Sequence, residues 1–344
     1  MKTLRYQVFL FGDCNNKCGF CFQDKMELNS RHNVVKICET VYKLQDCLNS
    51  IENPEQYDII LVTIFGGELF CWQEPVLYYL YEQIVDRLTL PNITLRVVTN
   101  LLYNNTKKLE DFIYYVRCKK VKLDLATSFD FESRFHTGDR LELFFDNYKK
   151  IIKIYPELSC VCTITKELCR KFKSLYYTHG EDGYNKYWNV FRYIYKSNPD
   201  GFEWLMYLKN ANKEHNEKNL PTDKDLYHFY VALRKYYPEL YKKWFIEFPE
   251  KTSWPCYEND VHRIIVNGQD HDERKFLLDK TNKSTPFYRS CHFKPTYCYT
   301  CEWYLKCQKL CYCNFEFTSP TKEYCYLKRL FLLDKFNPLN LLQM

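Results

Sequence analysis

Three cysteines near the start of the chain have the spacing of a metal-binding loop. They stand as Cys14-x3-Cys18-x2-Cys21 in a sequence of 344 residues. Three thiolates on one short loop can hold three irons of a four-iron, four-sulfur cluster and leave the fourth iron open. An open iron can bind a small molecule and pass it an electron. Zinc, which usually has four closed ligands, is the alternative metal for this spacing.

A second candidate site follows another apolar run of the sequence. Residues 58–65 predict a buried strand, and Gly66, Gly67 and Glu68 come directly after it. The whole chain has nine glycines, so an adjacent pair at a strand end is unusual. Glycines let backbone groups approach a ligand closely, and Glu68 adds a carboxylate that can accept hydrogen bonds from an ammonium group. A plain turn between a strand and a helix is the alternative interpretation.

The cysteine loop after a first strand and the Gly-Gly-Glu segment after a second strand together resemble the radical S-adenosylmethionine (SAM) superfamily. The resemblance implies that Cys14, Cys18 and Cys21 hold a [4Fe–4S] cluster. It also implies that Phe20 lies beside the adenine of SAM, and that the segment Gly66–Glu68 binds the amino group of its methionine moiety.

The third predicted strand adds two candidates to the same site. The run Arg96–Asn100 is similar to the third strand of the superfamily, which ends in a Thr-Asn pair. The resemblance therefore implies that Thr99 and Asn100 belong to the cofactor site. By the order of its motifs, the resemblance covers roughly residues 4–210.

A polar pattern after the fourth predicted strand resembles superfamily members that modify peptides. It consists of Ser128 and Asp130, followed by His136 and Arg140. The resemblance implies that Ser128 contacts the ribose of SAM and that Arg140 contacts its carboxylate. Phe131 stands where the family usually has glycine, so we expect this loop to follow a different path.

A second group of cysteines lies towards the other end of the sequence. The spacing Cys298-x2-Cys301-x5-Cys307-x3-Cys311, followed by Cys325, resembles the SPASM extension of radical SAM enzymes, which carries auxiliary iron–sulfur clusters. The resemblance implies that Cys298, Cys301, Cys307 and Cys325 hold an outer cluster, and that Cys311 reaches an inner one. A zinc ribbon is the alternative for the CxxC pair alone.

The inner auxiliary cluster has an incomplete set of expected ligands. Cys256 and Gly268 match the first half of the family element, but Glu273 stands where its second cysteine belongs. The sequence thus allows one or two auxiliary clusters. The residues that can replace the missing thiolate are Cys291, Cys313, His271 and Glu273 itself.

The composition limits the setting and the partners. The chain has 18 cysteines but no signal peptide and no apolar run long enough to span a membrane, so a reducing cytoplasm is the expected setting. A net charge of +6 without long basic runs argues against a nucleic-acid partner. The cysteines without motif spacing are expected to be mostly small buried residues: Cys38, Cys47, Cys71, Cys118, Cys160, Cys162 and Cys169.

Strand-like and helix-like segments alternate and predict a parallel α/β domain. The predicted strands are 5–11, 58–65, 93–98, 121–128, 159–164 and 203–208, and the predicted helices are 30–49, 74–88, 106–117, 141–155 and 165–176. The family resemblance implies a partial (β/α)6 TIM-like barrel over residues 1–210. A helical linker, 211–250, with two helices separated at Pro238, and a small cysteine-rich iron–sulfur module, 251–344, complete the expected organisation.

The expected activity is reductive cleavage of SAM, followed by hydrogen abstraction from a peptide or protein substrate. An external electron donor such as flavodoxin or ferredoxin is implied. The first cluster cysteine is residue 14, so we expect any leader peptide to bind elsewhere than in an N-terminal recognition domain. A small-molecule or nucleotide substrate, and a non-enzymatic zinc or iron–sulfur protein, are the alternatives. The general base stays open among Asp130, Glu273 and tyrosines.

Overall fold

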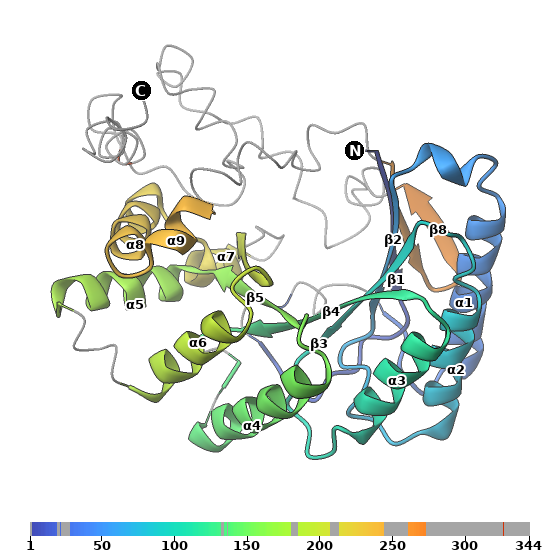
Figure 1. Cartoon of the computed structure of the whole chain (residues 1–344), viewed down its shortest axis with the longest axis horizontal. Coiled ribbons are helices and arrows are strands. Elements are labelled where there is room, and N and C mark those ends of the chain that lie inside the picture. The colour runs from blue at the N-terminus through green and yellow to red at the C-terminus, as the bar shows by residue number, and fades with distance from the viewer. Residues whose placement is uncertain are drawn as a thin grey trace, which may run out of the picture. The chain divides into compact units, whose positions relative to one another are not determined.

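The computed structural model describes residues 2–18, 21, 28–131, 134–135, 137–179, 185–206, 213–243, 261–272 and 326. In this part of the chain, strands and helices alternate as far as residue 206 (Figure 1). The strands are β1 (Thr3–Phe9), β2 (Ile59–Phe65), β3 (Ile93–Thr99), β4 (Lys122–Phe129), β5 (Ser159–Ile164), β6 (Phe202–Met206), β7 (Val261–Val266) and β8 (Gln269–Asp272).

The helices complete the α/β pattern. They are α1 (Val34–Asn49), the short 3-10 helix η2 (Pro54–Gln56), α2 (Pro75–Asp86), α3 (Lys107–Cys118), α4 (Gly138–Ile154), α5 (Lys166–Tyr177), α6 (Lys186–Ser197), α7 (Lys213–Asn219), α8 (Asp223–Tyr236) and α9 (Pro238–Tyr241). The six strands and five helices predicted for the first part of the chain are confirmed within a few residues. The predicted break at Pro238, between α8 and α9, is confirmed as well.

One sheet contains all eight strands in the order β6-β5-β4-β3-β2-β1-β7-β8. Strands β1 to β5 pair in parallel, β7 pairs with β1 in parallel, and β8 pairs with β7 antiparallel. The six strands expected within residues 1–210 are therefore present, and β7 and β8 extend their sheet. The open edge of β1 has backbone groups that need partners, and residues 261–272 provide them as a hairpin. Its turn uses Asn267 and Gly268, with φ of 52° and 75°.

The described residues fall into two compact units. The first is the described part of Met1–Cys162, Val190–Glu203 and Asn259–Thr285, and the second is that of Thr163–Asn189, Trp204–Glu258 and Pro286–Met344. The residues of β7 and β8 thus belong with the first unit, although the sequence assigned them to the C-terminal module.

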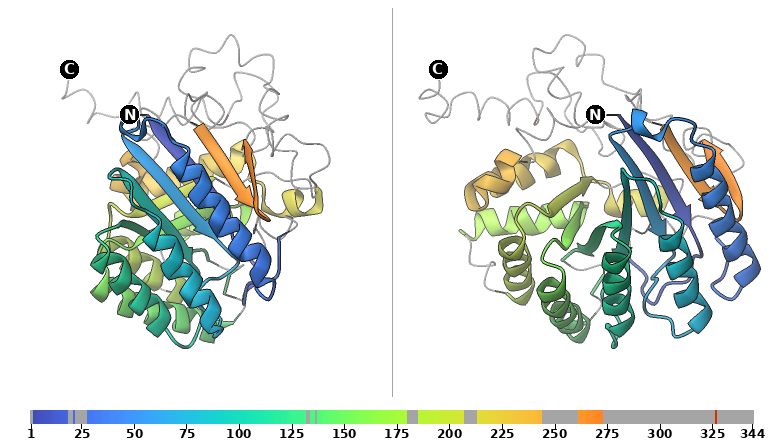
Figure 2. Two further views of the ribbon diagram at one scale, coloured as in Figure 1. Left: turned by 90° about the vertical axis from the view of Figure 1, so that its right-hand side faces the viewer. Right: turned by 45° about the vertical axis from the view of Figure 1, so that its right-hand side comes forward.

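Helices α1 to α4 of the first unit run along one face of the sheet (Figure 2). Successive strand residues point to opposite faces, so every second side chain meets these helices. The interface is apolar and nearly closed to water. Its most buried members are Val8, Ile60, Val62, Leu95, Val97 and Leu125 from the strands, and Ile37, Leu44, Ile84, Leu109, Ile113 and Phe144 from the helices.

The opposite face of the first unit's sheet is curved and carries charged side chains on β3, β4 and β6. Arg96 on β3 forms ion pairs with Asp124 on the adjacent β4, at 2.9 Å, and with Glu203 on β6, at 3.5 Å. In a flat sheet β3 and β6 would lie about 14 Å apart, three strand spacings. The second ion pair therefore requires that this part of the sheet curl towards its inner face, as in an open barrel.

The second unit is built around aromatic side chains. Phe172 on α5 lies 4.8 Å, between ring centroids, from Phe229 on α8, and 5.0 Å from Trp188. Such edge-to-face contacts favour aromatic pairs beyond the area that they bury. In the described part of the chain, no helix is both long and apolar enough to cross a lipid bilayer.

Candidate cofactor site

The expected cofactor-binding segments come together at one edge of the sheet. The cysteine loop follows β1, Gly66 follows β2, Asn100 follows β3 and Asp130 follows β4. These strands are parallel, so their carboxyl ends lie side by side, which is where ligands bind in open α/β sheets. The topology thus places the motifs as the sequence predicted.

Gly67 allows the cysteine loop to pass directly over the end of β2. Its φ is +52°, and a Cβ atom there would lie 1.8 Å from the carbonyl oxygen of Asp13. That carbonyl accepts a hydrogen bond from the backbone N–H of Glu68 at 3.1 Å. The glycines were expected to allow a ligand to approach the backbone closely. At Gly67 the group that approaches is the Asp13 carbonyl of the chain itself.

The Glu68 side chain reaches the end of β3. It is 1% exposed and accepts hydrogen bonds from Thr99 Oγ1 at 2.9 Å, from the Phe70 N–H at 3.2 Å, and from the Asn100 N–H. Burial raises the pKa of Glu68 to about 7, although the three donors oppose the shift. Glu68 therefore links β2 to β3. Its expected contact with the ammonium of SAM stays a prediction.

Asn100 ties the end of β3 to the cysteine loop. Its Nδ2 donates to Asn15 Oδ1 at 2.8 Å and lies 3.7 Å from Cys14 Sγ. Its Oδ1 accepts from the backbone N–H of Leu102 at 2.7 Å, while Asn15 Nδ2 donates to the Leu102 carbonyl at 2.6 Å. These reciprocal bonds hold the loop over β3. Asn100, the second residue of the Thr-Asn motif, therefore contacts the cysteine loop directly.

The three loop cysteines carry free thiols that are at least partly accessible. The backbone N–H of Asn16 lies 3.4 Å from Cys14 Sγ, and Asn16 Nδ2 lies 3.1 Å from Cys18 Sγ. The Cys21 N–H donates to the Cys18 carbonyl at 3.1 Å. No group of three or more Cys, His, Asp or Glu side chains within the described ranges converges on a single metal ion.

The pKa of the Cys14 thiol is raised to about 12, although part of this residue is exposed at the surface. The main cause is desolvation by the surrounding protein. The Asn16 N–H opposes it, and the negative charges of Glu68 and Cys18 add to it. The thiolate is the form that binds metals. Burial therefore favours the protonated thiol form of Cys14.

Arg140 reaches the same loop from α4. Its Nη1 donates to Asn16 Oδ1 at 2.9 Å, and its Nη2 donates to the Asn15 carbonyl at 3.0 Å. Ser128 is half-buried on β4 and shares a strand face with Asp124, so it lies on the inner, curved side of the sheet. The expected contacts of Arg140 and Ser128 with SAM stay predictions.

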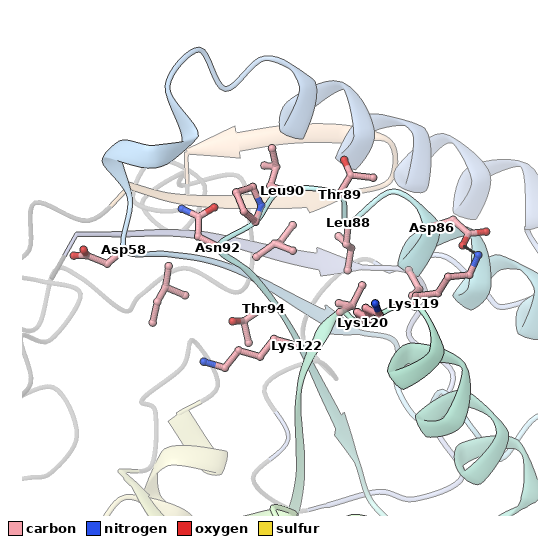
Figure 3. Close-up of a pocket in the computed structure, with 15 residues that line it drawn as sticks. Asp58, Asp86, Leu88, Thr89, Leu90, Asn92, Thr94, Lys119, Lys120 and Lys122 are labelled. Atoms are coloured by element: carbon pink, nitrogen blue, oxygen red, sulfur yellow. Dashed lines mark ion pairs between the residues drawn. The ribbon is translucent and has the colours of Figure 1, made fainter.

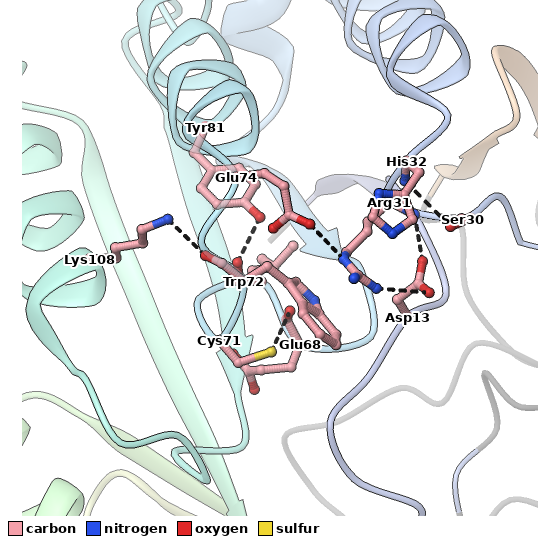
Figure 4. Close-up of polar contacts among 11 residues, drawn as sticks. Asp13, Ser30, Arg31, His32, Glu68, Cys71, Trp72, Glu74, Tyr81 and Lys108 are labelled. Atoms are coloured by element: carbon pink, nitrogen blue, oxygen red, sulfur yellow. Dashed lines mark hydrogen bonds and ion pairs between the residues drawn. The ribbon is translucent and has the colours of Figure 1, made fainter.

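Arg31 closes the cysteine loop and was not singled out from the sequence. Its Nε lies 2.9 Å from Glu74 Oε1, its Nη1 lies 3.4 Å from Asp13 Oδ1, and its guanidinium stacks 4.0 Å above the Trp72 ring (Figure 4). Asn29 accepts a hydrogen bond from the Gly12 N–H at 2.9 Å. The two ends of the loop are therefore tied together. Carboxylates at positions 13 and 74 gave no sequence signal of this pairing.

Several predicted site residues lie outside the described residues. They are Phe20, His136, Cys256, Glu273, Cys291, Cys298, Cys301, Cys307, Cys311, Cys313 and Cys325. Of the inner-cluster candidates, Gly268 lies in the β7–β8 turn, where its N–H donates to Thr40 Oγ1 at 3.0 Å, and His271 lies on β8.

The similarity of this chain to known proteins is weak and is found among solved structures. No family model matches the chain, and no curated protein matches it. Among solved structures it is similar to SuiB of Streptococcus suis bound to S-adenosylmethionine, with a TM-score of 0.37 and 13% sequence identity. The alignment covers 94% of this chain and 74% of SuiB. At these values the similarity carries no argument about function.

Proposed function

We propose that the chain is a radical SAM enzyme that modifies a residue of a peptide or protein. Its cysteine loop would hold a [4Fe–4S] cluster, and the segments after β2, β3 and β4 would bind SAM. When bound, the cluster supplies the electron that cleaves SAM to methionine and a 5′-deoxyadenosyl radical, which abstracts hydrogen from the substrate. An external flavodoxin or ferredoxin would deliver that electron, in the cytoplasm.

The observation that supports this proposal best is the meeting of three motifs that are distant in sequence. Asn100 lies against Cys14 and Asn15, and Glu68 is bonded both to Asp13 and to Thr99. A plain turn after β2 would not need a buried carboxylate with three donors. The contacts are better explained by a composite site built from the ends of three strands.

The residues present fit the proposed cluster. A four-iron cluster binds each thiolate through a different iron, so the three thiols do not need to converge on one ion. A buried cation, Arg134, lies near the cysteines and offers a counter-charge for an anionic group. Cys14, Cys18 and Cys21 would hold the cluster, while Asn16, Asn100 and Arg140 fix the loop.

The substrate class comes from the pattern after β4 and from the C-terminal cysteines. Both resemble radical SAM enzymes that modify peptides, by crosslinking, epimerisation or oxidation, including maturases of sulfatases. The curved inner face of the sheet carries half-exposed charged side chains on β3, β4 and β6. Such a face suits a polar substrate, and a peptide is the class that the sequence motifs favour.

The test is anaerobic reconstitution of the full chain with iron, sulfide, SAM and a reductant. We expect 5′-deoxyadenosine from the wild type and none from the triple variant Cys14→Ala/Cys18→Ala/Cys21→Ala. The double variant Cys38→Ala/Cys118→Ala, in helices α1 and α3, is the matched control and should keep the activity. Product formed by the triple variant would refute the cluster assignment.

Substrate class and the auxiliary module need two further measurements. Short peptides encoded near the gene are added, and mass spectrometry looks for a mass change that depends on SAM. A mass change confined to a small metabolite would contradict the peptide proposal.

Iron counting on the anaerobic protein should give at least about four irons beyond the first cluster. About four irons in total, with zinc bound, would favour a zinc module.

A further inference from the structure

Arg134 is a buried residue, and its backbone carbonyl and the Cys18 sulfur accept from the same Asn16 side-chain nitrogen. It is 6% exposed and lies in the connection between β4 and α4. Its backbone N–H donates to Asp130 Oδ1 at 3.2 Å, and its carbonyl accepts from Asn16 Nδ2 at 3.3 Å. The same Asn16 nitrogen lies 3.1 Å from Cys18 Sγ. The backbone of Arg134 is thus fixed against the cysteine loop.

The guanidinium of Arg134 has an unused donor. Its Nε is buried and has no hydrogen-bond partner among the residues that the structure describes. Burial disfavours the charge, yet the pKa of Arg134 is raised because Cys18 and Asp130 lie close, with smaller contributions from Cys14 and Cys21. A buried donor without an acceptor is costly. The residue thus combines a buried, unpartnered Nε with a backbone held against the cysteine loop.

Arg140, the arginine expected to bind the carboxylate of SAM, is already engaged with the chain. Two of its nitrogens donate to Asn16 and Asn15. Arg31, at the other end of the loop, pairs with two carboxylates. Of these three arginines, Arg134 is the one with a buried nitrogen that lacks an acceptor in the described part of the site.

We propose that Arg134 is the counter-charge of the cluster held by Cys14, Cys18 and Cys21, and that it raises the reduction potential of that cluster. This inference rests on the proposed function. One electron leaves the external donor, which is oxidised, and enters the cluster, which is reduced and becomes more negative by one charge. A fixed positive charge stabilises the reduced form more than the oxidised form. Arg134 is thus a positioning residue that acts through the cluster.

The test compares the reconstituted wild type with Arg134→Met, Arg134→Lys and Arg117→Met. Methionine keeps much of the side-chain length without the charge, and lysine keeps the charge. Arg117 lies exposed on α3, so its replacement removes the same charge where solvent screens it. A redox titration followed by absorbance and electron paramagnetic resonance gives the ratio of reduced to oxidised cluster. SAM affinity is measured on the oxidised cluster.

We expect Arg134→Met to lower the ratio of reduced to oxidised cluster about tenfold at a fixed potential. This change equals a decrease of about 59 mV in the one-electron reduction potential. Arg134→Lys should restore most of the loss, and Arg117→Met should match the wild type. An unchanged ratio in Arg134→Met overturns the proposal, as does a loss of SAM affinity at an unchanged ratio, which would assign Arg134 to the SAM carboxylate.

Iron uptake separates the remaining outcomes. If Arg134→Met binds no iron while Arg134→Lys does, the requirement for charge supports the proposal. If neither variant binds iron although both keep the wild-type circular dichroism, side-chain shape is responsible and the proposal is wrong. A wild type that binds no cluster refutes the proposed function itself, which is a different result.

Discussion

Charged side chains are buried at the carboxyl ends of the parallel strands and exposed at their amino ends. At the carboxyl ends, Glu68 and Arg134 are 1% and 6% exposed, and Glu68 is held by backbone donors. At the amino ends of β2, β3 and β4, charged side chains line an open cavity of about 620 Å³ (Figure 3). There Lys119 pairs with Asp86 at 2.8 Å, with side chains 46% and 35% exposed.

The two edges therefore differ in the energetic cost of their charged groups. An exposed ion pair contributes little to stability because water and salt screen it. A buried charge is costly unless it is bonded or faces a ligand. At the carboxyl edge, Glu68 and Arg134 are buried charged groups and bear this cost. At the amino edge, Lys119 and Asp86 are exposed and do not. Substitutions at the two edges should therefore differ strongly in their effects.

The largest effect is expected from Gly67→Ala. A side chain there needs a left-handed backbone and would meet the Asp13 carbonyl, so the cysteine loop must move. We expect a loss of roughly 3 kcal/mol or more in the free energy of unfolding, together with loss of iron uptake. Chemical denaturation and iron analysis measure both. Gly201→Ala is the control, since its Cβ meets the side chain of Asn198. Equal stability of Gly67→Ala and the wild type would disprove the close packing.

Glu68→Gln should have the next largest effect. Glu68 Oε1 accepts from the Phe70 N–H and Oε2 from the Asn100 N–H. Whichever way a glutamine amide is turned, its NH2 group faces one of these donors. We expect a loss of about 1–3 kcal/mol in the free energy of unfolding, measured at pH 7.5 in urea. A variant as stable as the wild type would mean that the carboxylate contributes nothing to the link between β2 and β3.

The raised pKa of Glu68 predicts a pH dependence of stability. The folded chain holds this proton up to about pH 7, whereas a carboxyl with the ordinary pKa of 4.5 loses it earlier. The part of the stability that depends on protonation of Glu68 is therefore complete below about pH 4.5 and is lost as the pH rises to about 7. Urea unfolding of the wild type and Glu68→Gln at pH 5 and pH 7.5 should show a smaller decline in the variant. Parallel declines would exclude a raised pKa.

Arg31→Gln should have a moderate effect. It removes a half-buried guanidinium that pairs with Asp13 and Glu74 and stacks on Trp72. We expect about 1–2 kcal/mol less stability and slower iron incorporation, because the ends of the cysteine loop are then joined less firmly. Unfolding in urea and the rate of iron uptake measure these quantities. Unchanged iron uptake would show that the loop keeps its shape without Arg31.

The smallest effect is expected at the amino edge. Lys119→Ala breaks the ion pair with Asp86, but both side chains are largely in water. Stability, iron uptake and SAM cleavage should all equal those of the wild type within error. A loss of iron uptake in this variant would abolish the contrast between the two edges.

Periodic elements and local motifs could be predicted from the sequence. The strand ranges followed from apolar runs, and the meeting of Gly66–Glu68 with the cysteine loop followed from parallel topology. The helix α6 was missed because its Tyr, Trp and Phe residues favour strands in isolation, although Trp188, Phe191 and Ile194 repeat at helical spacing and are buried. Most of the cysteines without motif spacing behave as expected: Cys47, Cys160, Cys162 and Cys169 are buried.

Contacts between distant parts of the chain could not be predicted. No local pattern distinguishes Arg134 from Arg140 as the buried arginine, because burial depends on the path of the whole loop after β4. The pairing of Arg31 likewise depends on two carboxylates, Asp13 and Glu74, that come from two distant segments. The pairing of β7 with β1 has the same origin, since any strand with apolar residues can fill an open edge.

The pairing of β7 with β1 also sets an order of events during synthesis. The strand that leads into the cysteine loop gains its second neighbour only from residues 261–272, and Gly268 then bonds to Thr40, 228 positions earlier. Contacts this distant in sequence form late, because a long chain segment must first be closed into a loop. On the ribosome the cysteine loop would thus be exposed well before its supporting strand is complete. Under the proposed function, a cluster could therefore enter the cysteine loop before the sheet around it is complete.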